Sequence, residues 1–146
     1  MDLTISRMQI SDLDLLADIL VSDFDDFWDL SVLKEELSSD NSLYFVAKFN
    51  NEIVGFAGIK IVLDEADLMN IVTKKCYRNN GIGKSLLNHI ISTSKDLGLI
   101  SITLEVNENN SIAIHLYENL GFENVGLRKN YYGNDNGLLM RKCFGN

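Results

Sequence analysis

The sequence predicts an α/β fold of the mixed, α+β kind, in which a mixed sheet carries helices on both faces in the order β-α-α-β-β-β-α-β-α-β-β. Segments of alternating apolar and polar residues, such as 100–106, predict strands. Other segments repeat apolar residues at helical spacing, as over 83–97. A turn with two glycines at 78–84 joins a predicted strand to a predicted helix. We expect one domain over residues 1–146, a length that can bury a hydrophobic core.

The expected strands are apolar runs bounded by turn residues. The second and third form a hairpin that turns at 50–51. In the fifth, apolar residues starting at Ile100 alternate with Ser101, Thr103 and Glu105, which predicts one apolar and one polar face. The segments expected to be strands are 3–8, 43–49, 52–62, 67–73, 100–106, 122–130 and 137–143.

The expected helices place apolar side chains three and four positions apart. Residues 11–14 cap the first helix, and either Asn109 or Asn110 caps the last. Gly98 and Gly121 end the third and fourth helices. The segments expected to be helices are 11–20, 28–37, 83–97 and 110–120.

Composition narrows the classes of function. The chain has 46% hydrophobic and 23% charged residues and no apolar run long enough to span a membrane, so we expect a soluble, cytoplasmic protein without a membrane partner. A net charge of −8 argues against a nucleic-acid partner and favours a basic partner. The alternative is that the charge serves only solubility. Cys76 and Cys143 have no metal-site spacing, so we expect no metal.

The glycine turn at 78–84 is the strongest sign of a ligand. It reads Arg-Asn-Asn-Gly-Ile-Gly-Lys and opens a helix, where bare backbone N–H groups suit a pyrophosphate. A P-loop needs glycine at position 78, which is Arg78, and a dinucleotide fingerprint needs glycine at position 86, which is Leu86. The pattern Gln/Arg-x-x-Gly-x-Gly/Ala fits at each defined position. An ordinary glycine turn before a helix is the alternative.

That pattern and the element order resemble the GNAT N-acetyltransferases over nearly the whole chain. Four segments are similar to the RimI family of bacterial GNAT enzymes, which acetylate the N-terminal alanine of a small-subunit ribosomal protein. They are D-E-A at 64–66, L-E-V at 104–106, L-Y-E-N-L-G-F at 116–122 and R-K-N-Y-Y at 128–132. The chain departs from the family where Phe27 replaces the usual proline, and where Asp135-Asn136-Gly137 replaces a Glu-Asp-Ala segment.

The resemblance implies two catalytic residues. Glu105 stands at the position of the family's general base, and Tyr117 at that of the acid that protonates the departing thiolate. From the residues alone, Glu105 fits a solvated carboxylate on a strand and Tyr117 fits a core tyrosine.

The resemblance also implies how acetyl-CoA, the expected co-substrate, is bound. Backbone N–H groups near Ile71, Val72 and Thr73 would polarise the thioester carbonyl, unless they pair within the sheet. Asn110 would bond the pantetheine arm, cap a helix, or do both. The residues expected at the pyrophosphate are Arg78, Asn79, Asn80, Gly81, Ile82, Gly83 and Lys84.

For the acceptor, we expect Trp28, Tyr131 and Tyr132 to line the site. Carboxylates and aromatic residues interleave over 23–29 and suit a basic peptide, although such a run also fits a helix with one wet and one packed face. The sequence therefore predicts an acetyl-CoA-dependent N-acetyltransferase, monomeric or weakly dimeric, that acts on a basic protein N-terminus. A small-amine acetyltransferase, for a polyamine or an antibiotic, and a non-catalytic acyl-CoA-binding module are the alternatives.

Overall fold

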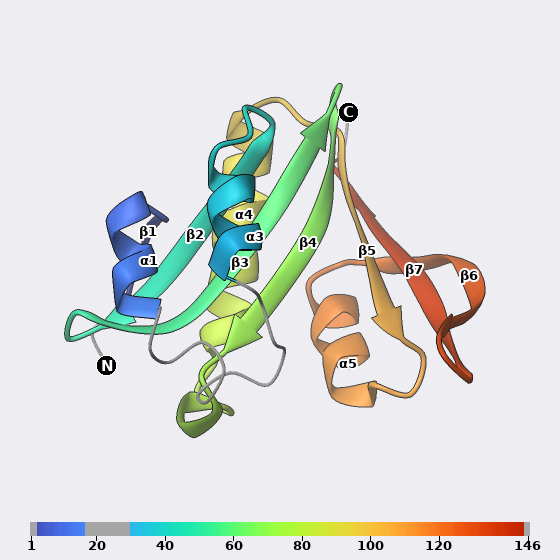
Figure 1. The fold of residues 1–146 in the computed structure, drawn as a ribbon. Helices are drawn as coiled ribbons and strands as arrows, with labels where there is room; N and C mark the ends of the chain where they lie inside the picture. The colour runs from blue at the N-terminus through green and yellow to red at the C-terminus, as the bar shows by residue number, and fades with distance from the viewer. Residues whose placement is uncertain (1–2, 17–29, 145–146) are drawn as a thin grey trace.

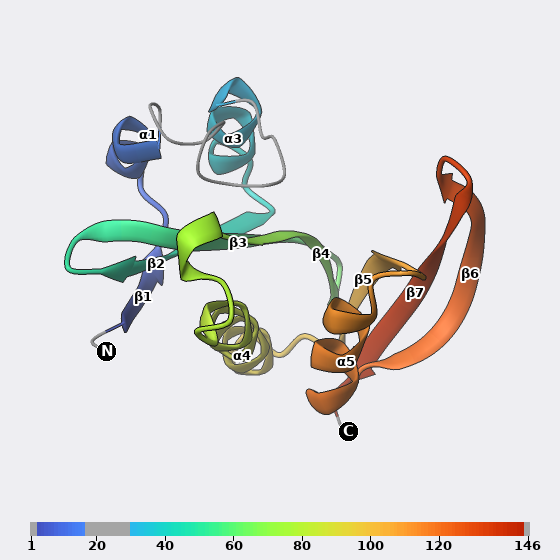
Figure 2. The same ribbon diagram turned by 90° about the horizontal axis from the view of Figure 1, so that it is seen from below.

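The computed structural model describes residues 3–16 and 30–144. A seven-stranded mixed sheet runs through it in the order β1-β2-β3-β4-β5-β7-β6. This topology and the helices on both faces confirm the predicted fold class (Figures 1 and 2). The strands are β1 (Leu3–Arg7), β2 (Ser42–Phe49), β3 (Glu52–Val62), β4 (Glu65–Thr73), β5 (Ser101–Asn107), β6 (Glu123–Tyr132) and β7 (Asp135–Cys143).

The helices cover the sheet from two sides. Figure 2 shows α1 and α3 over one face of the first four strands and α4 beneath the other, with α5 on the same side as α4. The helical segments are α1 (Ile10–Leu16), α3 (Leu30–Leu37), the short 3₁₀ turn η1 (Lys75–Tyr77), α4 (Ile82–Asp96) and α5 (Ser111–Asn119). None of the helices in the described residues has the length and hydropathy that crossing a bilayer requires.

Two hydrophobic clusters hold these layers together. Under the sheet, the apolar stripe of α4 packs on β2, β3 and β5, with Leu86 and Ile90 fully buried. Above it, Leu16 of α1 and Leu33 of α3 pack on Phe56. Because both faces of β3 are covered, its residues 53–59 are all buried, which explains their continuous apolar run.

The sheet divides between β4 and β5. These two strands are parallel neighbours, but they pair over only three residues, 65–67 with 101–103. Beyond that point they diverge toward their C-terminal ends, and α5 and the turn that follows β4 lie at the opening (Figure 1). The division leaves one edge of β4 without a neighbouring strand over the last part of its length.

Several predicted boundaries were wrong. Strand β4 begins at Glu65 rather than at residue 67. Helix α1 begins at Ile10, so Ser11 lies inside it; the cap is made by Asp12, whose carboxylate accepts a hydrogen bond from the Gln9 N–H at 2.7 Å. Such a bond three residues into a helix satisfies a donor that has no intrahelical partner.

The start of β5 also differs from the prediction. Ile100 precedes the strand and is exposed, whereas Ser101 opens the strand and is buried. The Ser101 hydroxyl donates to Glu65 Oε1 at 3.0 Å across the short β4–β5 pairing, so the buried hydroxyl has a hydrogen-bond partner. The predicted helix over 28–37 is described from Leu30 onward, and its first two residues lie outside the described residues.

Candidate active site

Three adjoining cavities follow the opening between β4 and β5. The turn cavity, about 710 Å³, lies between the end of β4, the glycine turn and α5. The central cavity, about 620 Å³, lies between β4, β5 and α5. The hairpin cavity, about 410 Å³, lies between β4, β5 and the β6–β7 hairpin. Thr73 and Gly83 line both of the first two, and Glu105 and Tyr132 line both of the last two.

The glycine turn presents backbone N–H groups to the turn cavity. Gly81 is the N-cap of α4 with a φ of 77°, a left-handed conformation that favours glycine, and it provides no side-chain cap. The first bond of the helix ladder runs from the Ser85 N–H to the Gly81 carbonyl at 3.0 Å. The N–H groups of residues 82–84 therefore precede the ladder, at the positive end of the helix dipole. This geometry fits the phosphates of a coenzyme.

The other predicted turn residues divide into two groups. Arg78, Asn79 and Lys84 line the turn cavity together with the glycines. The Asn80 side chain instead closes the loop, because its Nδ2 donates to the carbonyls of Tyr77 at 3.0 Å and Arg78 at 3.1 Å. Its side chain therefore braces the turn, and contact of Asn80 with a coenzyme stays a prediction.

The free edge of β4 supplies backbone donors to the central cavity. The Lys74 N–H donates to the Val54 carbonyl of β3 at 2.8 Å, and successive residues of an antiparallel strand alternate in direction. The N–H of Val72 therefore faces β3, while those of Ile71 and Thr73 face the opening. The prediction of three donors is thus reduced to Ile71 and Thr73, both of which line the central cavity.

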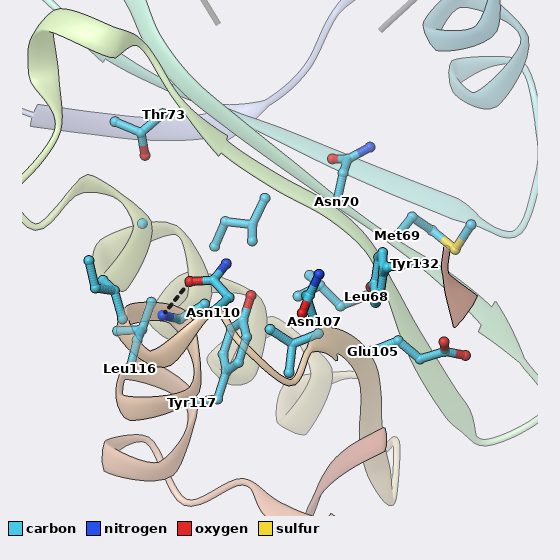
Figure 3. Close-up of a pocket in the computed structure, with 15 residues that line it drawn as sticks. Leu68, Met69, Asn70, Thr73, Glu105, Asn107, Asn110, Leu116, Tyr117 and Tyr132 are labelled. Carbon is cyan, nitrogen blue, oxygen red and sulfur yellow. Dashed lines mark hydrogen bonds between the residues drawn. The ribbon is translucent and has the colours of Figure 1, made fainter. Parts of the chain in front are cut away.

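Tyr117 combines the two roles that the sequence left open. It is buried on α5, and its ring lies 5.9 Å from that of Phe122, as expected of a core residue. It also lines the central cavity, and Figure 3 shows its hydroxyl pointing into that cavity near Asn110. Burial, with a smaller contribution from Tyr132, raises the pKa of Tyr117 to about 12. The phenol is therefore protonated near neutral pH.

Glu105 is not the solvated carboxylate that its strand pattern allowed. Its side chain is 20% exposed, and Oε1 lies 3.0 Å from Nη2 of Arg128 on β6. Oε2 is buried and has no hydrogen-bond partner among the described residues. Figure 3 shows the carboxylate directed away from Tyr117, at the end of the central cavity where Tyr132 lies. Glu105 lines both the central and the hairpin cavity, and a carboxylate in that position is suited to accept a proton from a ligand.

Asn110 is the N-cap of α5. Its Oδ1 accepts a hydrogen bond from the Ala113 N–H at 3.2 Å, which fixes the choice between Asn109 and Asn110 (Figure 3). Asn110 also lines the central cavity, with its amide nitrogen on the cavity side in the same view. The cap is therefore observed, and contact with a pantetheine arm stays a prediction.

The predicted acceptor residues are partly described. Tyr131 and Tyr132 line the hairpin cavity with their rings 4.9 Å apart and nearly perpendicular. Trp28 and the acidic and aromatic run over 23–29 lie outside the described residues.

Among the residues that the structure does describe, no group of three or more His, Cys, Asp or Glu side chains is placed to hold a metal ion.

Comparison with known proteins decides the family. The model of the acetyltransferase (GNAT) family matches residues 13–122. The chain belongs to the GNAT acetyltransferase family. The members of this family are acetyltransferases, and the similar proteins described next are named N-acetyltransferases.

The similar proteins include enzymes named for one acceptor. The ribosomal protein bS18-alanine N-acetyltransferase of Haemophilus influenzae is 46% identical over 96 residues, which cover 62% of this chain and 65% of that enzyme. The crystal structure of the Escherichia coli ribosomal-protein-S18-alanine N-acetyltransferase superposes with a TM-score of 0.89 at 30% identity, over 99% of this chain and 96% of that one. A Bacillus anthracis acetyltransferase solved with acetyl coenzyme A shares the fold, with a TM-score of 0.82 at 23% identity over 99% and 100% of the chains.

The structure adds residues to this GNAT site that the sequence did not single out. Asn70 lines the central cavity and donates from Nδ2 to the hydroxyl of Tyr44 at 3.1 Å, while its Oδ1 is buried without a partner among the described residues. Arg128 contacts Glu105, and a Cβ on Gly137 would lie 3.4 Å from Glu105 Oε2. The R-K-N-Y-Y segment indicated this region, but the pairing of Arg128 with Glu105 depends on three strands meeting and has no local signal.

Replacing Gly81 by alanine tests the turn. The substitution forces a side chain into the left-handed region at a cost of about 1–2 kcal/mol, although the space for a Cβ is open. Gly133 has a φ of 71° and equally open space at the β6–β7 turn, so it is the matched control. We expect similar losses of stability in urea for both variants, but weaker coenzyme A binding by calorimetry for Gly81→Ala only. Equal affinities in the two variants would contradict the assignment of the turn.

The buried tyrosines predict a loss of stability at high pH. Burial raises the pKa of Tyr44 and Tyr117 from 10.0 to about 12. Above pH 10 the unfolded chain loses these protons while the folded chain keeps them, so their stabilising contribution is present below pH 10 and is lost as pH rises toward 12. The free energy of unfolding, measured in urea from pH 9 to 12, should show this fall. It should decrease less steeply with pH in Tyr44→Phe and Tyr117→Phe. Slopes identical to that of the unaltered protein in both variants would refute it.

Proposed function

We propose that this enzyme acetylates the N-terminal α-amine of a basic protein, and specifically the N-terminal alanine of ribosomal protein bS18. The observation that carries the proposal is the order of the three cavities. They lead from backbone N–H groups at the glycine turn, past Tyr117, to Glu105 beside the β6–β7 hairpin. Similarity to enzymes named for bS18 supports the acceptor, although the first of these is matched over 65% of its length.

The coenzyme would enter at the turn cavity. The N–H groups of residues 82–84, with Lys84 and Arg78 beside them, would hold its phosphates. The pantetheine arm would then lie along the free edge of β4 and α5, where Asn110 lines the wall. Acetyl-CoA, when bound there, supplies a thioester carbonyl to be attacked and a thiolate to leave.

Glu105 and the edge of β4 would serve the attack. An α-amine has a pKa near 8 and is mostly protonated at neutral pH. Glu105 would take that proton, directly or through a water, and the lone pair of the amine would become free to form the new C–N bond. The N–H groups of Ile71 and Thr73 would face the carbonyl oxygen as negative charge builds on it.

Tyr117 would serve the departure of the sulfur. Because burial raises the pKa of Tyr117 to about 12, the phenol keeps its proton near neutral pH and can donate a hydrogen bond. Its hydrogen bond to the sulfur would stabilise the thiolate as the C–S bond breaks, and the thiolate would then take up the second proton that the nitrogen loses as the amide forms. The transfer would be direct, in a ternary complex, without an acyl-enzyme.

The hairpin cavity suits a basic peptide end. Asp67 and Glu105 place two carboxylates in it, and Tyr131 and Tyr132 supply aromatic surface. The net charge of −8 would attract a cationic protein over a longer range. An acceptor that is itself a ribosomal protein would place the enzyme in the cytoplasm.

Replacing Glu105 by glutamine removes the proposed base with little change in shape. We expect kcat to fall by about a hundredfold to ten-thousandfold, the usual contribution of a general base, with coenzyme A affinity unchanged. Glu118→Gln, an exposed carboxylate on α5, is the matched control and should keep full activity. If Glu105→Gln and Glu118→Gln have the same kcat, Glu105 is not the general base.

A panel of acceptors tests the proposed reaction. Peptides that begin with Ala, Ser or Met and continue with basic residues should be acetylated at the N-terminal amine, located by mass spectrometry. The same peptides with a blocked N-terminus are the control and should remain unmodified. Turnover on a polyamine with none on any peptide would show a small-amine acetyltransferase instead.

A further inference from the structure

We propose that, in the free enzyme, Arg128 occupies the position beside the Glu105 carboxylate that the ammonium group of the acceptor takes when it binds. Binding of the acceptor is then an exchange of one cation for another on a single carboxylate. The inference rests on the proposed function and adds Arg128 as a residue that selects the acceptor.

The contacts of the pair show which partner is fixed and which is exposed. Arg128 Nη2 lies 3.0 Å from Glu105 Oε1, with the arginine side chain 54% exposed and the glutamate side chain 20% exposed. Among the described residues that line the hairpin cavity, Arg128 is the one lysine or arginine. The guanidinium thus covers the outer side of a carboxylate whose other oxygen has no described partner.

Glu105 does not depend on Arg128 for its position. Strand β5 pairs with β7 in unbroken register from Ser101 to Asn107, and Glu105 is opposite Leu139 in that ladder. Gly137 on β7 lets the chain close around the carboxylate, because a Cβ there would lie 3.4 Å from Oε2 and 3.3 Å from atoms of Tyr131 and Tyr132. Removal of the guanidinium therefore leaves the backbone and the packing around Glu105 in place.

Arg128, in contrast, stands where its strand becomes irregular. The register of β6 on β7 shifts between Arg128 and Tyr132, and Asn130 has a φ of 54°. The guanidinium also lies over the Tyr131 ring, with Cζ 4.7 Å from its centroid, and Asp67 lines the same cavity. A displaced Arg128 thus has an aromatic face and a second carboxylate within its cavity, which lowers the cost of releasing Glu105.

The exchange has a consequence for selectivity. An acceptor that brings a positive charge to Glu105 replaces the contact that it breaks, whereas a neutral group leaves the carboxylate without a cation. Productive binding therefore requires an unblocked, cationic N-terminus. A partly exposed ion pair is worth little, so its removal should change acceptor affinity by about fivefold.

The experiment compares Arg128→Gln with Lys129→Gln, a neighbouring exposed charge on β6. With a basic acceptor peptide, Arg128→Gln should lower KM about fivefold at unchanged kcat, while Lys129→Gln leaves KM within twofold of the original. Arg128→Lys, which keeps a cation, should have a KM nearer that of the unaltered enzyme. Methylguanidinium should compete with the peptide more strongly in Arg128→Gln, because it can refill the vacated position.

Opposite results overturn the inference. A fall in kcat at unchanged KM would make Arg128 a positioning residue for Glu105. A higher KM, or equal KM values in the two glutamine variants, would show that Arg128 does not compete with the acceptor. Failure of the proposed function is distinguished from these, because it would appear as no turnover on any peptide by the unaltered enzyme.

Discussion

The division of the sheet between β4 and β5 is the constraint on which the site depends. Parallel strands that paired along their whole length would use their backbone groups on each other and would leave no opening. Here the pairing stops after Asp67 and Thr103, and the N–H groups of Ile71 and Thr73 face a cavity. The glycine turn and α5 lie at the same opening (Figure 1). Unpaired backbone, the N-terminus of α4 and the side chains that line the cavities therefore meet there.

A second constraint is the burial of charge at the far end of this opening. Glu105 must remain available to a ligand, yet a mostly buried carboxylate is costly without a cation nearby. Arg128 meets that need from the exposed side, at a place where β6 departs from regular pairing. The same contact that stabilises the free enzyme thereby sets a condition on what can bind.

The sequence predicted the parts whose causes are local. Gly81 marks the turn because its left-handed backbone favours glycine, and the order of helical and strand patterns predicted the topology. The sequence could not show which N–H groups of β4 face the opening. The choice of Ile71 and Thr73 over Val72 follows from which residues pair with β3. The pairing of Arg128 with Glu105 was missed because it depends on the offset of β6 against β7 and of β7 against β5.

Amide chemical shifts of the ¹⁵N-labelled protein, titrated with coenzyme A, test the central claim most directly. If the free edge of β4 and the start of α4 hold the coenzyme, the largest changes fall on Ile71, Thr73 and residues 81–84. Val72, whose N–H faces β3, should change much less. Two results would contradict a site that depends on the separation of β4 from β5. At saturating coenzyme A, the amide shift of Val72 would change as much as those of its two neighbours, or the amide shifts of the glycine turn would not change.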